Sequence, residues 1–320
     1  MRVLITGATG FIGGNFAREL LKNGHIVSAI VRKTSNAESL RRAGAELIRA
    51  DITDEESLGG IRRGDFDIAV HSAGLVDFKN YAGMRRVNAK GTENVCRMAA
   101  GIGVKKLVYI SSVSVVSGND SVPLSESLPY RASNIYGRSK LEAEKIAVGF
   151  RDRGLNTVIL RPCMVYGEGE PHLLDKMLFL MKHRMLPLLG RGDAKWHLVY
   201  IGNLTAAMTL ATEKDMLDGG TFFVADKEIL TVREVFEIMC SGIGTRPPLR
   251  LPEWTARVFG TLPLVGDKFD FFLKDKVYDI SRIESLGYRP PFRAQDALRR
   301  TAIKWLEARR GSKNQMTPSG

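Results

Sequence analysis

A tyrosine and a lysine four residues apart form the pair in this sequence that most directly suggests catalysis. The segment 136–140 reads YGRSK within a helix predicted over 134–149, so Tyr136 and Lys140 share one helix face. A phenol with a pKa of about 10 is a poor acid or base at neutral pH, but a neighbouring ammonium lowers that pKa. Of the eight tyrosines, only Tyr136 has a lysine four residues later. The pair predicts a general acid and base for alcohol and ketone chemistry, although a surface helix pair can have the same spacing.

Two serines follow an apolar run that we expect to be a strand. Residues 106–110 read KLVYI, and Ser111 and Ser112 come directly after them. At the carboxyl end of a parallel strand, a serine hydroxyl can donate a hydrogen bond to a substrate carbonyl or alkoxide oxygen. We expect Ser112 to take this role, with Ser111 as the alternative; a loop serine that caps a backbone group is the simpler structural interpretation.

A glycine-rich loop lies near the start of the chain. Residues 6–14 read TGATGFIGG after the apolar run 3–5, and Gly7, Gly10 and Gly13 are three residues apart. In the order strand, loop, helix, such glycines permit a tight turn, close approach of a pyrophosphate, and close helix–strand packing. The helix N-terminus then offers free N–H groups to the phosphates. The loop therefore predicts dinucleotide binding rather than a turn without a ligand.

The residue after the second predicted strand should select between the two nicotinamide dinucleotides. An acidic side chain there accepts from the ribose 2′-hydroxyl of NAD, whereas an arginine accommodates the 2′-phosphate of NADP. Here the strand-like run 25–31 is followed by Arg32 and Lys33, and the first acid is Glu38. Arg32 therefore favours NADP(H), with NAD(H) as the alternative.

Short apolar runs alternate with helical patterns through the first half of the chain. This alternation predicts an α/β fold with a Rossmann-type, doubly wound parallel sheet. Such sheets bind ligands beyond the carboxyl ends of their strands, where the glycine loop and the two serines lie. The expected strands are 3–5, 25–31, 46–50, 68–71, 106–110 and 157–160, and the clearest helices are 11–22, 84–101 and 134–149.

The second half is less regular and predicts a smaller, partly interleaved C-terminal substrate domain. The runs 198–201 and 221–224 resemble later strands of the same sheet, whereas 227–310 carries helical patterns. We therefore expect a dinucleotide-binding domain of residues 1–165 and 197–226, a substrate-binding domain of residues 166–196 and 227–310, and a frayed tail of residues 311–320.

Several motifs together resemble the extended short-chain dehydrogenase/reductase superfamily. The resemblance is close over residues 1 to about 225 and looser to about 308; it is specific for the superfamily and much less specific for the substrate. It implies an NAD(P)-dependent oxidoreductase with a Ser-Tyr-Lys mechanism and a homodimer formed through the helices that begin near Asn88 and Ile135. The motifs are TGATGFIG, DITD at 51–54, HSAG at 71–74, VNAKGT at 87–92, Ser111-Ser112, YGRSK, Arg161-Pro162 and DISRIESLGYRP.

The resemblance implies a role for each matching residue. Tyr136 would be the acid and base, Lys140 would bind the nicotinamide ribose and lower the Tyr136 pKa, and Ser112 would orient the carbonyl. Asn88 would support these residues from the neighbouring helix, and His71 would hold the local backbone. No metal is expected. The dinucleotide would contact Gly7, Thr9, Gly10, Phe11, Ile12, Gly13, Arg32, Asp51, Ile52, Ser72, Ala73, Gly74, Tyr136, Lys140 and Pro162, with Asp51 and Ile52 at the adenine and Arg161 beside Pro162 at the nicotinamide side.

Two branches of the superfamily remain open. Nucleotide-sugar members often place an arginine four residues before the position of Tyr200, where it binds a diphosphate; this chain has Trp196 there. Lys195 or Arg191 could substitute, although a lysine is a point charge rather than a planar fork. Val113 takes a place that is often polar in epimerases. These departures favour a dehydrogenase or reductase similar to 3β-hydroxysteroid dehydrogenases and dihydroflavonol reductases, with a hydrophobic or unphosphorylated substrate. The alternative is a nucleotide-sugar epimerase or dehydratase with tightly bound NAD.

Composition limits the partners and the compartment. The 320 residues carry a net charge of +12, but their basic residues are scattered in pairs, so we expect a basic surface rather than a nucleic-acid reader. Three widely spaced cysteines favour reduced thiols and a cytoplasmic enzyme. The sequence contains no run of about 18 apolar residues, so we predict no membrane span. The apolar segment 251–273 predicts a helical lid, with a substrate wall or a peripheral membrane patch as alternatives.

Overall fold

The computed structural model describes residues 1–252, 254–255 and 272–314, which form two compact units. The first unit comprises Met1–Cys163, Ile201–Val224 and Asp279–Arg289. The second comprises the described parts of Met164–Tyr200, Ala225–Tyr278 and Pro290–Gly320. Each unit is therefore built from segments that are distant in the sequence.

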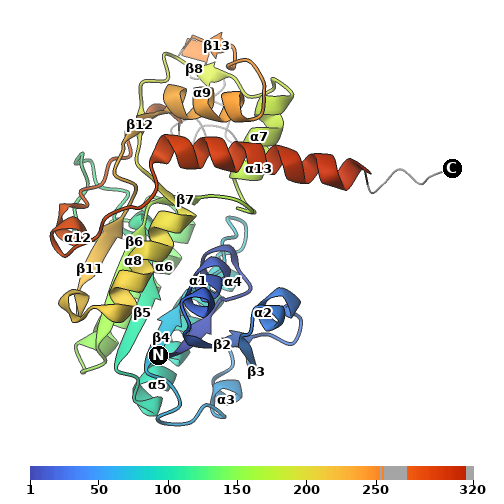
Figure 1. Ribbon diagram of the computed structural model, residues 1–320. Helices are drawn as coiled ribbons and strands as arrows, with labels where there is room; N and C mark the ends of the chain where they lie inside the picture. The colour runs from blue at the N-terminus through green and yellow to red at the C-terminus, as the bar shows by residue number, and fades with distance from the viewer. Residues whose placement is uncertain (253, 256–271, 315–320) are drawn as a thin grey trace. The chain divides into compact units, whose positions relative to one another are not determined.

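The first unit contains a seven-stranded parallel sheet with the strand order β11-β6-β5-β4-β1-β2-β3 (Figure 1). The order reverses between β1 and β4, which is where ligands bind in such sheets. The strands read as continuous apolar runs because both faces of the sheet are covered; Val3, Leu4 and Ile5 of β1 are fully buried. The predicted Rossmann-type fold is confirmed. The strands are β1 (Arg2–Thr6), β2 (Ile26–Val31), β3 (Glu46–Arg49), β4 (Ile68–His71), β5 (Lys106–Ile110), β6 (Thr157–Pro162) and β11 (Thr221–Val224).

Helices cover this sheet. Figure 1 shows α1 and α8 side by side on the near face, and the two helices are in contact. Helices α5 and α6 also pack together and share a core cluster with sheet residues such as Leu107 and Ile159. The helix predicted over 84–101 is present, but a π-helical segment, η1, interrupts it. The helical segments are α1 (Phe11–Lys22), α2 (Glu38–Arg42), α3 (Glu55–Leu58), α4 (Tyr81–Met84), η1 (Arg85–Lys90), α5 (Gly91–Ile102), η2 (Val113–Val115), α6 (Ile135–Arg151), α8 (Ile201–Glu213), η3 (Asp215–Leu217) and α12 (Ser281–Ser285).

The described part of the second unit includes helices α7, α9 and α13 and short paired strands. Helix α13 packs on α9 and α7, and Thr231 forms a capping box with Glu234 at the start of α9. Strand β7 pairs with β10 in parallel, β9 with β12 antiparallel, and β8 with β13 in parallel. The bounds are α7 (Leu174–Lys182), α9 (Val232–Gly242), α13 (Ala294–Asn314), β7 (Met164–Tyr166), β8 (Leu188–Leu189), β9 (Lys195–Trp196), β10 (Leu198–Tyr200), β12 (Leu230–Thr231) and β13 (Arg250–Leu251).

The structure corrects one predicted strand and several predicted domain boundaries: residues 164–165, 197–200 and 225–226, which we assigned to the dinucleotide-binding domain, belong to the second unit. The run 221–224 joins the main sheet as predicted, but the prediction for 198–201 is wrong, because 198–200 pairs with β7 in the second unit and α8 begins at Ile201. Residues 279–289, which we assigned to the substrate domain, belong to the first unit. They are tied there because Arg282 Nη1 donates to Thr221 O and Tyr288 Oη donates to Asn203 O.

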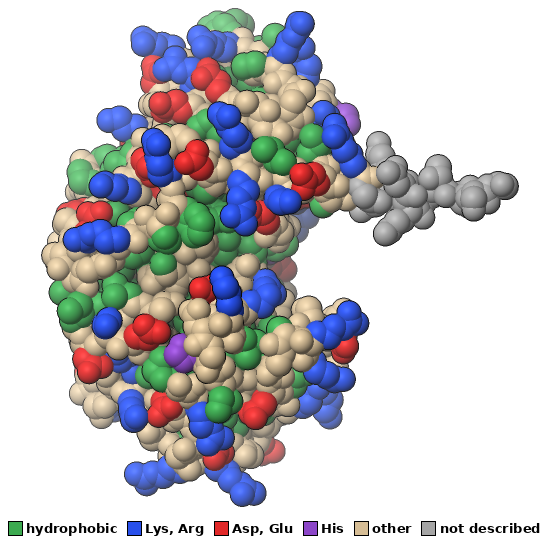
Figure 2. Space-filling view, in the orientation of Figure 1, with side chains coloured by type: hydrophobic (Ala, Val, Ile, Leu, Met, Phe, Trp, Pro, Cys, Tyr) green, Lys and Arg blue, Asp and Glu red, His purple; other side chains and the backbone are tan. Residues whose placement is uncertain are grey.

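Helix α13 continues to Asn314, four residues into the segment expected to fray, and 315–320 lie outside the described residues. Most of 251–273, with its predicted lid, also lies outside them. Within the described ranges, no helix is both long and apolar enough to cross a bilayer. Figure 2 shows Lys and Arg side chains interspersed with Asp and Glu on the visible face rather than gathered on one element.

A buried histidine joins the central strands at their carboxyl ends. His71, at the end of β4, is fully buried; its Nδ1 lies 2.7 Å from Thr6 Oγ1 of β1, and its Nε2 lies 2.9 Å from Thr92 Oγ1 of α5. Burial lowers the pKa of His71 to about 3, and the positive charge of Lys140 adds to this effect. His71 is therefore neutral near neutral pH, and its ring contacts two threonine side chains rather than the backbone that we expected it to hold.

Because His71 is neutral in the folded protein, the free energy of unfolding depends on pH. The folded-state pKa lies below the ordinary value of 6.5, so the unfolded chain binds the extra proton, and stability falls as the pH drops from 6.5 towards about 3. Between pH 7.5 and pH 5, this one group should cost about 2 kcal/mol of unfolding free energy. In urea unfolding, the free energy of unfolding of His71→Gln should fall by about 2 kcal/mol less between pH 7.5 and pH 5 than that of the wild type. The control His172→Gln changes an exposed histidine and should lose as much as the wild type. Equal losses in both variants would contradict the assignment.

Candidate active site

Tyr136 and Ser112 lie together at the start of α6. Asn134 caps this helix with Oδ1 accepting from Gly137 N at 2.8 Å, which places Tyr136 in the first turn. Burial raises the pKa of Tyr136, and a hydrogen bond with the Ser112 side chain opposes that rise. The structure thus pairs Tyr136 with Ser112, the serine that the sequence favoured.

Two neighbouring serines have separate partners. Ser112 Oγ donates to Ser114 Oγ at 2.9 Å and accepts from Ser114 N at 3.1 Å. Ser111 Oγ instead donates to the buried Glu144 carboxylate. Ser114 was not among the predicted site residues. Its only sequence signal is its position two residues after Ser112, where a side chain can complete a local turn.

Lys140 lies one turn after Tyr136 but points to the strand end. Its side chain is almost fully buried, Nζ donates to Ile110 O at 2.8 Å, and Nζ lies 4.5 Å from the centroid of the Tyr109 ring. Burial lowers the pKa of Lys140 to about 7, and Glu144 opposes that shift. The expectation that Lys140 lowers the Tyr136 pKa is not met in this structure, where burial of the phenol dominates.

A buried carboxylate that the sequence reasoning missed lies one turn further along α6. Glu144 is fully buried and accepts from Arg161, with Nε–Oε1 at 3.0 Å and Nη2–Oε1 at 2.5 Å. It also accepts from Ser111 and, at 2.8 Å, from Tyr130 Oη. The Arg161 side chain, at the end of β6, is therefore paired with the Glu144 carboxylate. The available signal was the four-residue spacing from Lys140, which puts Glu144 on the same helix face.

Asn88 connects the loop after β4 to α6. It lies almost fully buried in the π-helical segment; its Oδ1 accepts from Leu75 N at 2.7 Å, and its Nδ2 donates to Leu75 O at 3.0 Å. The same Nδ2 donates to Ser139 Oγ at 2.9 Å, three residues after Tyr136. Asn88 thus positions the strand-end loop against the helix that carries Tyr136 and Lys140.

The glycine loop is packed too closely for larger residues. Gly7 has φ of +74°, and a Cβ there would lie 2.5 Å from Ala73 N; a Cβ on Gly13 would collide with Ser72 Oγ. Gly10 N donates to Gly7 O at 2.9 Å. Gly10 is also the N-cap residue of α1, and no side chain caps the first N–H groups of this helix. The exposed Thr9 and Gly10 leave this turn accessible.

The remaining predicted contacts lie at the carboxyl ends of the strands. Ser72 Oγ donates to Thr6 O at 2.8 Å, which joins β4 to the glycine loop, and Asp51 Oδ1 accepts from Thr53. Arg49 Nη1 donates to Arg32 O at 3.0 Å, so two arginines adjoin at the ends of β2 and β3. These predicted contact residues differ in solvent exposure. The exposed ones are Arg32 and Gly74, the half-buried ones are Phe11, Ile12, Asp51, Ser72 and Ala73, and the buried ones are Ile52 and Pro162.

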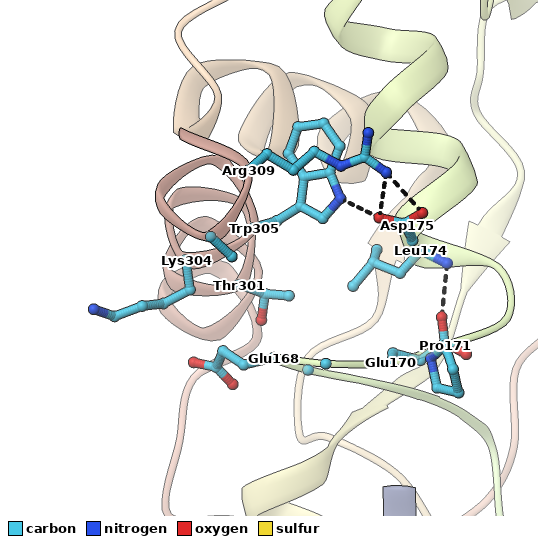
Figure 3. Close-up of a pocket in the computed structure, with 12 residues that line it drawn as sticks. Glu168, Glu170, Pro171, Leu174, Asp175, Thr301, Lys304, Trp305 and Arg309 are labelled. Atoms are coloured by element: carbon cyan, nitrogen blue, oxygen red, sulfur yellow. Dashed lines mark hydrogen bonds and ion pairs between the residues drawn. The ribbon is translucent and has the colours of Figure 1, made fainter. Parts of the chain in front are cut away.

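The second unit contains a cavity of about 460 Å³ between the 167–171 loop, α7 and α13. Figure 3 shows Trp305 and Arg309 converging on Asp175: Trp305 Nε1 lies 2.6 Å and Arg309 Nη2 2.9 Å from Asp175 Oδ1. In the same unit, Trp196 is 1% exposed and packs against Phe236. The tryptophan that replaces the expected arginine is thus a core residue.

Comparisons with known proteins identify relatives of several activities. Residues 3–225 match the model of the NAD dependent epimerase/dehydratase family. The chain is 30% identical to a UDP-glucose 4-epimerase of Vibrio cholerae, over 96% of each chain. It is 28% identical to a 3 beta-hydroxysteroid dehydrogenase/Delta 5-->4-isomerase of Mycobacterium tuberculosis, over 93% of this chain and 88% of the relative. It also resembles the crystal structure of DesIV, a dTDP-glucose 4,6-dehydratase from Streptomyces venezuelae with NAD and TYD bound, with a TM-score of 0.76, 25% identity and 98% coverage of each chain.

Proposed function

Because the chain belongs to the NAD-dependent epimerase/dehydratase family, we propose that it transfers a hydride between a nicotinamide dinucleotide and an alcohol or ketone. The observation that carries this proposal is the placement of the Tyr136 phenol beside Ser112, at the start of a helix whose Lys140 side chain is also buried. A hydroxyl pair of this kind can bind and protonate one substrate oxygen.

The glycine loop fits the pyrophosphate of a dinucleotide. Side chains at Gly7 or Gly13 would fill the turn, and the first N–H groups of α1 have no side-chain cap. When bound, the nicotinamide supplies the carbon that gives or takes the hydride. Thr9, Gly10, Phe11 and Ile12 would hold the phosphates, and the resemblance to the NAD-bound DesIV structure supports this assignment.

Tyr136 would move the proton at the substrate oxygen. Because burial raises its pKa, the phenol keeps its proton near neutral pH, which suits donation to a carbonyl as that carbonyl is reduced. In the oxidising direction the same oxygen must first lose its proton, and as a phenolate it would accept the proton of the alcohol, so the raised pKa favours reduction near neutral pH. Ser112 would donate to the substrate oxygen, and Ser114 N, which donates to Ser112 Oγ, would orient that hydroxyl.

The surroundings of Tyr136 favour an apolar substrate. Phe78, on the loop after β4, is 59% exposed, and its ring centroid lies 6.3 Å from that of Tyr136. Val76 on the same loop is also exposed. An exposed aromatic side chain beside the reacting hydroxyl suits a hydrophobic alcohol or ketone better than a sugar. Within the second unit, the cavity beside α7 and α13 has the size of a small-molecule site.

A nucleotide-sugar epimerase is the second candidate. Its support is the 30% identity to the Vibrio cholerae UDP-glucose 4-epimerase over almost the whole chain. Epimerisation also uses hydride transfer, but the hydride returns to the substrate, so no reduced dinucleotide accumulates. Tight binding of UDP-glucose in calorimetry, with interconversion of the sugar, would favour this candidate.

Replacing Tyr136 with Phe removes the proposed acid and base but keeps the ring. Turnover of any alcohol or ketone substrate should fall about 100- to 10,000-fold, while dinucleotide affinity stays unchanged. Steady-state kinetics and calorimetry measure the two effects. The matched control is Tyr81→Phe, which removes a phenol that donates to Glu142 at 2.6 Å on the outer face of α6, and it should keep its turnover. Full activity of Tyr136→Phe would refute the assignment.

Arg32 should set the dinucleotide preference. We propose that it holds the 2′-phosphate of NADP, so Arg32→Asp should weaken NADP binding about 10- to 100-fold and spare NAD. The control Arg62→Asp makes the same charge change at an exposed position before β4 and should leave the ratio of NADP to NAD affinity unaltered. An unchanged ratio in Arg32→Asp would exclude this role.

A further inference from the structure

The first unit contains a second cavity, of about 560 Å³, remote from Tyr136. It is lined by residues of the 126–130 loop, the end of α6, β6, β11 and the start of α12. Val148 and Arg151 of α6 line it, and they follow Tyr136 by roughly 18 to 22 Å along the helix axis. Its volume lies within the range of small-molecule sites. Ser112, Tyr136 and Lys140 do not line this cavity, so it is separate from the residues proposed to move the proton.

Three arginines and one carboxylate line this cavity: Arg151, Arg161, Arg282 and Glu126. The charge of Arg161 is balanced by the buried Glu144, which leaves two arginines against Glu126. Hence the lining and Glu144 together carry a formal charge of +1, from three arginines and two glutamates. A bound anionic group would neutralise this remaining positive charge.

The two other arginines are held mainly by uncharged acceptors. Arg151 Nη1 donates to Gly219 O at 3.0 Å, and Arg282 Nη1 donates to Thr221 O at 3.1 Å. Arg151 Nε lies 3.7 Å from a carboxylate oxygen of the exposed Asp152, which is beyond hydrogen-bond distance. Backbone carbonyls fix a guanidinium without neutralising it, and the remaining N–H groups of the fork can bind an oxyanion.

Aromatic rings hold the guanidinium groups further. The Arg282 guanidinium carbon lies 4.9 Å from the centroid of the Phe222 ring, and that of Arg161 lies 5.4 Å from the centroid of the Tyr130 ring. Stacked guanidinium groups lose little freedom when they bind an anion. The cavity also has an apolar wall, formed by Leu128, Pro129, Tyr130 and Val148.

We propose that this cavity is a binding site for an amphipathic organic anion, a carboxylate or phosphate attached to an apolar or aromatic body. Arg151 and Arg282 bind the anionic group, and the apolar wall contacts the body. Phenyl phosphate and 3-phenylpropionate test the two kinds of anion, and 3-phenylpropionamide, which is neither an alcohol nor a ketone, is the neutral probe.

Isothermal titration calorimetry of the full chain, at fixed ionic strength, measures the affinity of each probe. At least one anionic probe should bind about tenfold tighter than 3-phenylpropionamide, and Arg282→Gln should weaken that binding about tenfold. The matched control Arg153→Gln removes an exposed arginine near the end of the same helix and should have no effect. If phenyl phosphate binds only at the glycine loop, its affinity should be the same in the wild type and in Arg282→Gln, which would count against the cavity as its site.

Glu126→Gln provides a test that misfolding cannot imitate. Glu126 Oε1 accepts from Phe223 N at 2.9 Å, and a glutamine amide oxygen keeps that hydrogen bond while it removes the negative charge. The anionic probe should bind about threefold tighter or more to this variant. Equal affinities in the wild type, Arg282→Gln and Glu126→Gln for both anionic probes, or no binding of either, would overturn the proposal.

Discussion

The candidate active site depends on one buried ion pair, between Glu144 and Arg161. Glu144 is fully buried, and its two oxygens accept hydrogen bonds from Arg161 of β6, Ser111 at the end of β5, and Tyr130 before α6. Such a pair costs desolvation energy, but removal of one partner leaves a buried charge and costs about 3–5 kcal/mol. The carboxylate therefore fixes α6 relative to two strand ends, and through them the positions of Ser112 and Lys140.

The central strands impose the second constraint. Their carboxyl ends meet at one edge, where the glycine loop packs against Ala73 and His71 joins β1, β4 and α5. Asn88 then links the loop after β4 to α6. The residues that we propose for cofactor binding and catalysis thus lie at one edge of the sheet although they are far apart in the chain. Relatives with epimerase, dehydratase and dehydrogenase names match most of this chain, so membership of the family does not fix the substrate.

Features with a local cause could be predicted from the sequence. The glycine loop followed an apolar strand and opened a helix, and Tyr136 and Lys140 had the spacing of one helix face. Pairings between distant segments could not be predicted: Glu144 meets Arg161 through the sheet, and the strand at 198–200 finds its partner in β7 rather than in the main sheet. Trp196 was recognised as a departure, but only packing against Phe236 showed it to be a core residue. The sign of the Tyr136 shift was missed for the same reason, because burial is a property of the fold.

The central claim is net hydride transfer between a nicotinamide dinucleotide and an apolar alcohol or ketone. Its most direct measurement is the absorbance of reduced dinucleotide when the protein is mixed with NADP or NAD and a panel of hydrophobic secondary alcohols, including sterols. Reduced dinucleotide should accumulate mole for mole with the ketone for at least one alcohol. Interconversion of a nucleotide sugar without any accumulation, together with no reaction of any alcohol in the panel, would contradict the claim.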